Sequence, residues 1–239
     1  MLSIKTMDSP TSAVVVAGIV GATAVLKPFF EKITGAAGDV VAGRINDHFG
    51  AKRVINLAKV VTLAQAKARE EGLDPSKIPL KVIHPLLENA SLEEDENLQE
   101  MWGTLLAKAA NTTETFTSPA FVEVLRQLRP NEAKFFNNIY LDVMRRGIDF
   151  DERLRTPSEE HPTDNIGITQ TMYEEKYAGE MPPHEVSFSL SNLSRLGLLS
   201  EPHVGRLHFA MTAFGLVFGS TVCDWEKVTS EIPASMPPQ

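Results

Sequence analysis

Apolar residues recur every three or four positions over most of the chain, the spacing of one buried face on an α-helix. The clearest example lies between Lys52 and Glu71, where lysines and arginines fall largely off the apolar face. That face consists of Val54, Leu57, Val61, Ala64 and Ala68. Gly72 follows at a position that suits a C-terminal cap. The pattern predicts a helix of about five turns that ends at Gly72.

Residues 78–110 predict two further helices joined by an acidic corner. Pro79 opens the first helix, because the N–H that proline lacks would be unsatisfied there anyway. Its buried face is predicted to contain Val82, Ile83, Leu86 and Leu87. The second helix is predicted to bury Leu98, Met101, Trp102, Leu105 and Leu106. Trp102 is expected in the core, with an interface anchor as its alternative role.

The acidic corner has the signature of a helix start. Ser91 is predicted to be the N-cap, and Glu94 three residues later completes a capping box. Glu93, Glu94, Asp95 and Glu96 would then fill the first turn, where the positive end of the helix dipole favours carboxylates. Adjacent carboxylates on one turn point around the helix and do not converge. Capping therefore explains this cluster without a metal or acid–base role.

Residues 13–26 carry no charge, and three interpretations compete for them. Fourteen residues are fewer than the roughly 20 that cross a bilayer, which favours a buried or oligomer-packing helix. A signal peptide is the second interpretation, although Lys5 is the single basic residue before the run. The third is a conditional membrane segment that would use residues 13–30. Residues 35–50 follow, and their four glycines predict a helix with close neighbours.

Prolines divide the next part of the chain. Pro119 starts a helix with Phe121, Val122, Leu125 and Leu128 on its apolar face. Pro130 ends it, and Asn131 or Pro130 begins another that runs to Gly147. Residues 148–167 are charged and are expected to form a flexible connection. Residues 168–178 are expected to form a short helix.

The C-terminal part has the order of a winged-helix module. A helix starts at Pro182–Pro183 and ends at Gly197, a hairpin turns near Gly205, and a last helix starts at Thr212. The apolar face expected for the first helix is Val186, Phe188, Leu190, Leu193 and Leu196. In DNA-binding versions this helix presents cations and amides to the major groove. Here it offers Arg195, Asn192 and four serines, too little positive charge to hold phosphates.

The chain is therefore expected to be mainly α, with a helical N-terminal and central region and a small winged-helix-like C-terminal module. The predicted parts are an apolar, glycine-rich arm over 1–50, a central helical region over 51–129, the module over 130–228 and a disordered tail over 229–239. A chain of 239 residues is long enough to bury a full core in such parts.

Charge and cysteine content narrow the function classes. The net charge of −8 and pI near 5.3 argue against nucleic acid as a partner. Cys223 is the single cysteine, so no intramolecular disulfide can form and a reducing, cytoplasmic location fits. Cys223 lies in an apolar helix and is expected to be buried and unreactive.

No motif predicts catalysis. The sequence has no glycine-rich phosphate loop, no HExxH motif and no Cys–His spacing for zinc, and its six histidines are scattered. No catalytic, cofactor-binding or metal residue is therefore predicted, and the protein is not expected to be an enzyme. The candidate interaction surface is Glu93, Glu94, Asp95, Glu96 and Trp102.

The acidic corner and the helix after Pro119 resemble the bacterial Abi-alpha family, which is named for abortive-infection resistance to phage. The residues that carry this resemblance are Ala90, Ser91, Leu92, Glu93, Asp95, Leu98, Trp102, Leu105 and Leu106. Gly103 departs from the family pattern, where a better helix former is usual. The resemblance covers the middle and last thirds of the chain and supplies no catalytic residues.

The resemblance implies anti-phage defence, exerted through protein–protein contact or oligomerisation. Two alternatives stay open at this point. One is a membrane-acting effector that uses residues 13–26 and associates with the membrane on activation. The other is a transcription regulator that uses the winged-helix order.

Overall fold

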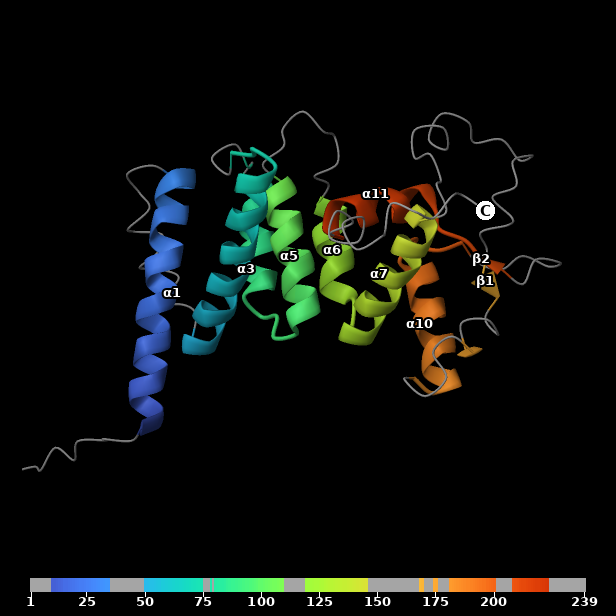
Figure 1. Ribbon diagram of the computed structural model, residues 1–239, viewed down its shortest axis with the longest axis horizontal. Helices are drawn as coiled ribbons and strands as arrows, with labels where there is room; N and C mark the ends of the chain where they lie inside the picture. The colour runs from blue at the N-terminus through green and yellow to red at the C-terminus, as the bar shows by residue number, and fades with distance from the viewer. Residues whose placement is uncertain are drawn as a thin grey trace, which may run out of the picture. The chain divides into compact units, whose positions relative to one another are not determined.

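A computed structural model describes residues 10–34, 50–74, 78, 80–109, 119–145, 168–169, 174–175, 181–200 and 208–223 (Figure 1). Contacts divide the chain into two compact units, Met1–Arg126 and Gln127–Gln239, and each is described by itself. Several predicted features lie outside the described residues, among them Pro79, Gly147, Gly205, most of 35–50, and the segments 148–167 and 229–239. The described residues are mainly helical, which confirms the predicted class.

Helices build the first unit. They are α1 (Pro10–Thr34), α3 (Ala51–Glu70), α4 (Leu80–Ala90), α5 (Glu96–Lys108) and α6 (Pro119–Gln127), whose last residue, Gln127, is counted with the second unit. Helix α3 is central, because it packs against both α1 and α5, as Figure 1 shows. All five residues of its predicted apolar face are at most 3% exposed. The helical period alone was therefore sufficient to identify the face on which this unit is assembled.

Helix α3 ends as the sequence predicts. Gly72 follows the C-cap Glu71 with a φ of +67°, a left-handed conformation that glycine adopts without steric cost. The N–H of Leu73 then donates to the carbonyl of Ala68 at 2.7 Å. This bond is the outer one of a Schellman motif, which satisfies a carbonyl that the helix leaves open.

The predicted capping box at Ser91 is wrong. Helix α5 begins at Glu96, and its N-cap is Asp95, whose Oδ1 accepts a hydrogen bond from the N–H of Leu98 at 3.0 Å. Ser91 instead follows the last turn of α4, and its N–H donates to the carbonyl of Leu87. Of the four acidic residues, Glu96 alone lies in the first turn of α5. Two capping residues stand four positions apart here, and the later one starts the helix.

Gly103 permits a close approach between α5 and α3. A Cβ at this position would lie 2.8 Å from the Cβ of Leu63 and 3.3 Å from the carbonyl oxygen of Val60. A carbon atom needs about 3.5 Å, so any side chain would push the two helices apart. The departure of Gly103 from the family pattern therefore has a packing reason.

Residues 13–26 are helical and belong to α1. The helix continues past the uncharged run through Pro28 to Thr34, and Leu26, Phe29 and Phe30 are buried. One side of the run is exposed, because the side chain of Val20 is 65% exposed. Among the described residues, no helix is both long enough and apolar enough to span a membrane.

The second unit combines helices with short strands. Its elements are α7 (Pro130–Arg145), β1 (Ile168–Thr169), α10 (Pro183–Arg195), β2 (His208–Phe209) and α11 (Ala213–Val222). Strands β1 and β2 pair antiparallel, with Ile168 opposite Phe209. The short helix predicted over 168–178 is therefore wrong at its start, although Glu174 and Glu175 have helical backbone. A two-residue strand has no period of its own that the sequence could reveal.

Next to β2, the chain on both sides of the predicted hairpin turn is paired. Leu199 forms an antiparallel bridge with Met211, and the N–H of Ser200 donates to the carbonyl of Ala210 at 2.8 Å. Gly197 ends α10 with a φ of +76°, as predicted for a cap. The expected apolar face of α10 holds for Val186, Leu190 and Leu193 but not for Phe188, which is 57% exposed.

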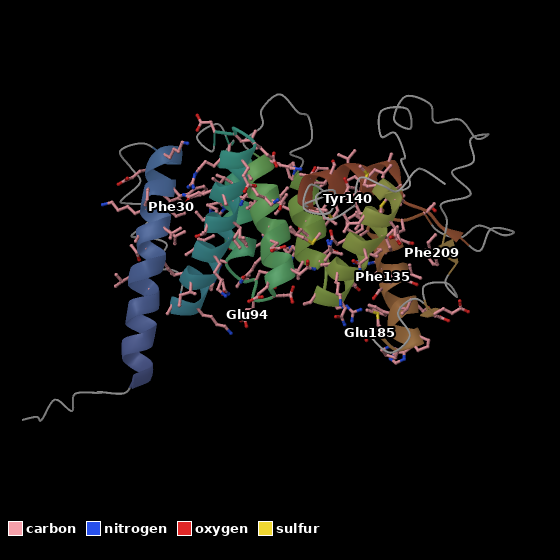
Figure 2. All side chains as sticks on the ribbon, in the orientation of Figure 1. Phe30, Glu94, Phe135, Tyr140, Glu185 and Phe209 are labelled. Carbon is pink, nitrogen blue, oxygen red and sulfur yellow. The ribbon has the colours of Figure 1, made fainter. Side chains whose placement is uncertain are left out.

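Aromatic residues form the core of the second unit. The rings of Phe136 and Phe218 lie 5.3 Å apart between α7 and α11, and the ring of Tyr140 stacks beside that of Phe136. Figure 2 labels Tyr140 among the side chains of this unit. Burial raises the pKa of the Tyr140 phenol, and the neighbouring Cys223 adds to the shift. Cys223 is 2% exposed, which confirms that its thiol is buried.

Candidate functional site

A polar cluster fixes the acidic corner of the first unit to α3. The hydroxyl of Ser91 is fully buried and donates to the carbonyl of Glu88 at 2.6 Å. It accepts two hydrogen bonds from the guanidinium of Arg53, at 3.0 and 2.8 Å. Asn56 adds a longer contact of 3.4 Å from its amide nitrogen to the carbonyl of Ser91. Residues 35 to 38 positions apart in sequence thus hold the α4–α5 corner in register with α3.

The four predicted acidic residues serve local structure in different ways. Glu93 Oε1 accepts from the N–H groups of Glu94 and Asp95, both at 2.9 Å, and Asp95 caps α5. Glu94 pairs with Lys52 at 2.6 Å, with both side chains largely exposed (Figure 2). Glu96 is exposed at the first position of α5. In the part of the chain that the structure describes, no three carboxylate, histidine or cysteine side chains gather as metal ligands would.

Trp102 does not share a surface with these carboxylates. Its side chain is 1% exposed and belongs to the core of α5, as the apolar stripe predicted. The exposed residue beside the carboxylates is Leu92, at 58%. Leu92 is among the residues that carry the family resemblance, but the predicted interaction surface did not include it.

The second unit contains a polar cluster that sequence reasoning missed. Glu132, at the third position of α7, is fully buried. Its carboxylate accepts from the N–H of Arg129 at 3.0 Å, from the Arg129 Nε at 3.1 Å and from the amide of Asn192 on α10 at 2.9 Å. The spacing of Arg129 and Glu132 was the signal in the sequence for this cluster. A glutamate three residues after an N-cap can accept a hydrogen bond from the N-cap N–H.

Asn192 and Arg195, which offer too little positive charge for DNA contact, form hydrogen bonds inside the second unit. Asn192 binds Glu132, and Arg195 donates to the amide oxygens of Asn192 at 2.9 Å and Gln127 at 3.2 Å. Arg129 lies over the exposed ring of Phe188, 4.5 Å from its centroid, a cation–π geometry. The solvent side of α10 therefore presents the Phe188 ring, which the Arg129 guanidinium covers. The side-chain amide of Asn192 on α10 is already bound to Glu132 on α7.

These arrangements define a class of protein. It is mainly helical, and its polar clusters tie helices together without converging on a reactive centre in the described residues. The family model for abortive infection alpha matches residues 52–210, more than half of the chain. The chain belongs to this family, as the residues around the acidic corner predicted. No match was found among curated proteins or among solved structures.

Proposed function

We propose that this protein acts in bacterial abortive-infection defence against phage, through protein–protein contact or self-association and without catalysis. Membership of the abortive infection alpha family supports the defence role. The observation that carries the non-catalytic part is the use of the acidic corner. Glu93 and Asp95 hold backbone N–H groups, and Glu94 holds Lys52, so these carboxylates complete the fold and leave no converging pair for acid–base chemistry.

We further propose that the second unit is a winged-helix-like module. The order α7, β1, α10, β2 and α11 supports this, together with the antiparallel pairing of β1 with β2. The pairing of Leu199 with Met211 adds a second arm beside β2, where the wing hairpin would begin. In this proposal α10 is the helix that DNA-binding relatives of the fold place in the major groove.

The same helix favours contact with protein over DNA. Duplex binding depends on cations that neutralise phosphates. Arg195 is the only lysine or arginine in α10. The exposed Phe188 beneath Arg129 instead has the composition of a protein-contact anchor. We expect no sequence-selective duplex shift at nanomolar protein and physiological salt. Such a shift would support the transcription-regulator alternative and contradict this proposal.

The defence role is tested by expressing the protein in a phage-sensitive bacterium and counting plaques across a broad phage panel. We expect fewer plaques with at least one phage, relative to an empty vector. The control is a parallel culture in which immunoblotting and a melting curve of the purified protein establish that it is present and folded. Unchanged plaque numbers with every phage, under that control, would contradict the proposal.

A further inference from the structure

Helices α1, α3 and α5 border an open groove of about 530 Å³ in the first unit. Apolar side chains form much of it, including Val25 of α1 and Ile55 and Leu63 of α3. Charges of both signs stand on it as well, with Lys59 on the α3 side and Glu96 and Glu100 on the α5 side. A groove with an apolar lining and mixed charges has the composition that accepts an amphipathic helix.

Two glycines of α1 line this groove, and they differ in what the fold needs from them. A Cβ at Gly18 would lie 3.1 Å from Ile55 Cδ1, so Gly18 allows α1 and α3 to approach. A Cβ at Gly21 would meet no atom within 4 Å. Glycine in a helix interior destabilises it by about 1 kcal/mol relative to alanine. Gly21 therefore gives the described residues of this unit no packing advantage in return for that cost.

The exposed face of α1 next to Gly21 is apolar and small. Val20, Gly21, Ala24 and Pro28 are all exposed, and they follow each other at the spacing of one helical strip. Its first charges are Lys27 and Glu31, which pair with each other at 3.8 Å and are each about half exposed. Small residues on a helix let a second helix approach closely. This strip of α1 thus suits a helix-to-helix contact.

We infer that the occupant of this groove is α1 of a second copy of the chain, so that two first units associate through a two-fold axis. Helix α1 supplies both parts of such a contact. Its exposed apolar strip would be buried by a partner, and other residues of α1 form one wall of the groove that would receive the partner's strip. A two-fold contact requires such self-complementarity, because one patch meets itself. The charges are compatible with this occupant, since Lys27 and Glu31 beside the strip and Lys59 and Glu96 on the groove give both patches charges of both signs, so a second copy meets little net repulsion. The inference deepens the proposed self-association and rests on it.

The association is tested with the purified full chain and two matched substitutions. Ala24→Glu places a charge in the proposed contact, and Ala213→Glu places the same charge at an exposed position at the start of α11. Sedimentation velocity over a concentration series should show a dimer for the wild-type chain and for Ala213→Glu. It should show at least about hundredfold weaker association for Ala24→Glu, because an unpaired charge is costly to bury.

A covalent test locates the contact. Cys223 is buried, so a thiol introduced by Ala24→Cys is the accessible one. Ala24 is at the middle of the strip, so the proposed contact places it at the two-fold axis, where equivalent positions come within disulfide reach. Mild oxidation with diamide should therefore join two copies through Ala24→Cys. The equivalent Ala213→Cys chain should stay monomeric on a non-reducing gel.

A wild-type chain that sediments as a monomer at every concentration would overturn the inference, as would an undiminished dimer in Ala24→Glu. Both glutamate variants must keep the wild-type far-UV circular dichroism spectrum, which is expected because both alanines are exposed. The outcome is separate from the plaque assay. A dimer without plaque protection would contradict the defence role alone, and protection by a monomer would contradict this contact alone.

Discussion

Among the described residues, each unit has a completely buried polar side chain at a helix end, and these two side chains differ in charge. Ser91, after α4, is a neutral hydroxyl that receives the guanidinium of Arg53. Glu132, in the first turn of α7, is a carboxylate that receives Arg129 and Asn192. Both clusters join a helix end to a helix far away in sequence, over 38 residues in one unit and 60 in the other.

The difference shows two ways to set the register of packed helices. In the first unit the apolar face of α3 already fixes its neighbours, and the Ser91 cluster adds a local lock. In the second unit α10 is held to α7 by a polar contact to a buried carboxylate as well as by apolar packing. Loss of a carboxylate that accepts three hydrogen bonds should cost more than loss of one hydroxyl, so the two units should respond unequally to equivalent substitutions.

The largest effect is expected from Glu132→Ala. The substitution removes the acceptor of three hydrogen bonds from Arg129 and Asn192, and about 3 kcal/mol of unfolding free energy should be lost at about 1 kcal/mol for each bond. Glu132→Gln keeps the shape and one acceptor oxygen, so its loss should be clearly smaller. Urea denaturation of both variants measures this. Equal losses in the two would indicate that the charge of Glu132 is unimportant.

Ser91→Ala should have the next largest effect. It leaves the Arg53 guanidinium without its hydroxyl acceptor, and a loss of about 2 kcal/mol is expected for a hydrogen bond to a charged group. The matched measurement is Asp95→Ala, which removes the N-cap of α5 and should cost about 1 kcal/mol. A larger loss for Asp95→Ala than for Ser91→Ala would reverse the expected ranking.

Gly103→Ala tests the apolar side of the comparison. The new methyl group meets Leu63 at 2.8 Å, and overpacking of this kind costs about 1–3 kcal/mol. Alanine returns about 1 kcal/mol through its helix propensity, so a net loss of about 1 kcal/mol is expected. Gly21→Ala on α1 is the control, because its methyl group meets no described atom within 4 Å and should raise stability. A stabilised Gly103→Ala chain would show that α3 and α5 can separate freely.

The smallest effect is expected from Glu94→Ala. The pair with Lys52 is short, but the two side chains are 60% and 72% exposed, and exposed pairs contribute about 0–1 kcal/mol. The change in unfolding free energy should be below about 0.5 kcal/mol at physiological salt. Repeating the measurement at low salt is the control, since a real ion pair gains strength there. If Glu94→Ala lost as much unfolding free energy as Ser91→Ala, the Glu94–Lys52 pair would be a principal stabilising contact, contrary to this prediction.

Local periodicity was sufficient where an apolar face decides the structure. It identified the buried faces of α3 and α5 and the proline starts of α6, α7 and α10, because these features depend on residues within one or two turns. It failed where a distant residue decides. Ser91 was predicted as a cap, but Arg53 recruits its hydroxyl, and β1 exists through its pairing with His208 and Phe209.

The candidate site was only partly accessible to such reasoning. The sequence identified the carboxylates and predicted that they serve helix capping. The predicted N-cap position was wrong, since Asp95 and not Ser91 starts α5. Glu132 was missed because its burial depends on Asn192, which comes 60 residues later. The exposure of Val20 and Phe188 was missed because interpretation of helical sequence patterns assigns apolar residues to the buried face by default.

The lone thiol of Cys223 has a practical consequence. It is buried at the end of α11, beside the phenol of Tyr140, and it is the single cysteine of the chain. A thiol reagent such as a maleimide dye can therefore react only when this end of the second unit opens, and the labelling rate then reports the frequency of opening. The labelling rate of Cys223 therefore measures local opening of the second unit in the unmodified protein.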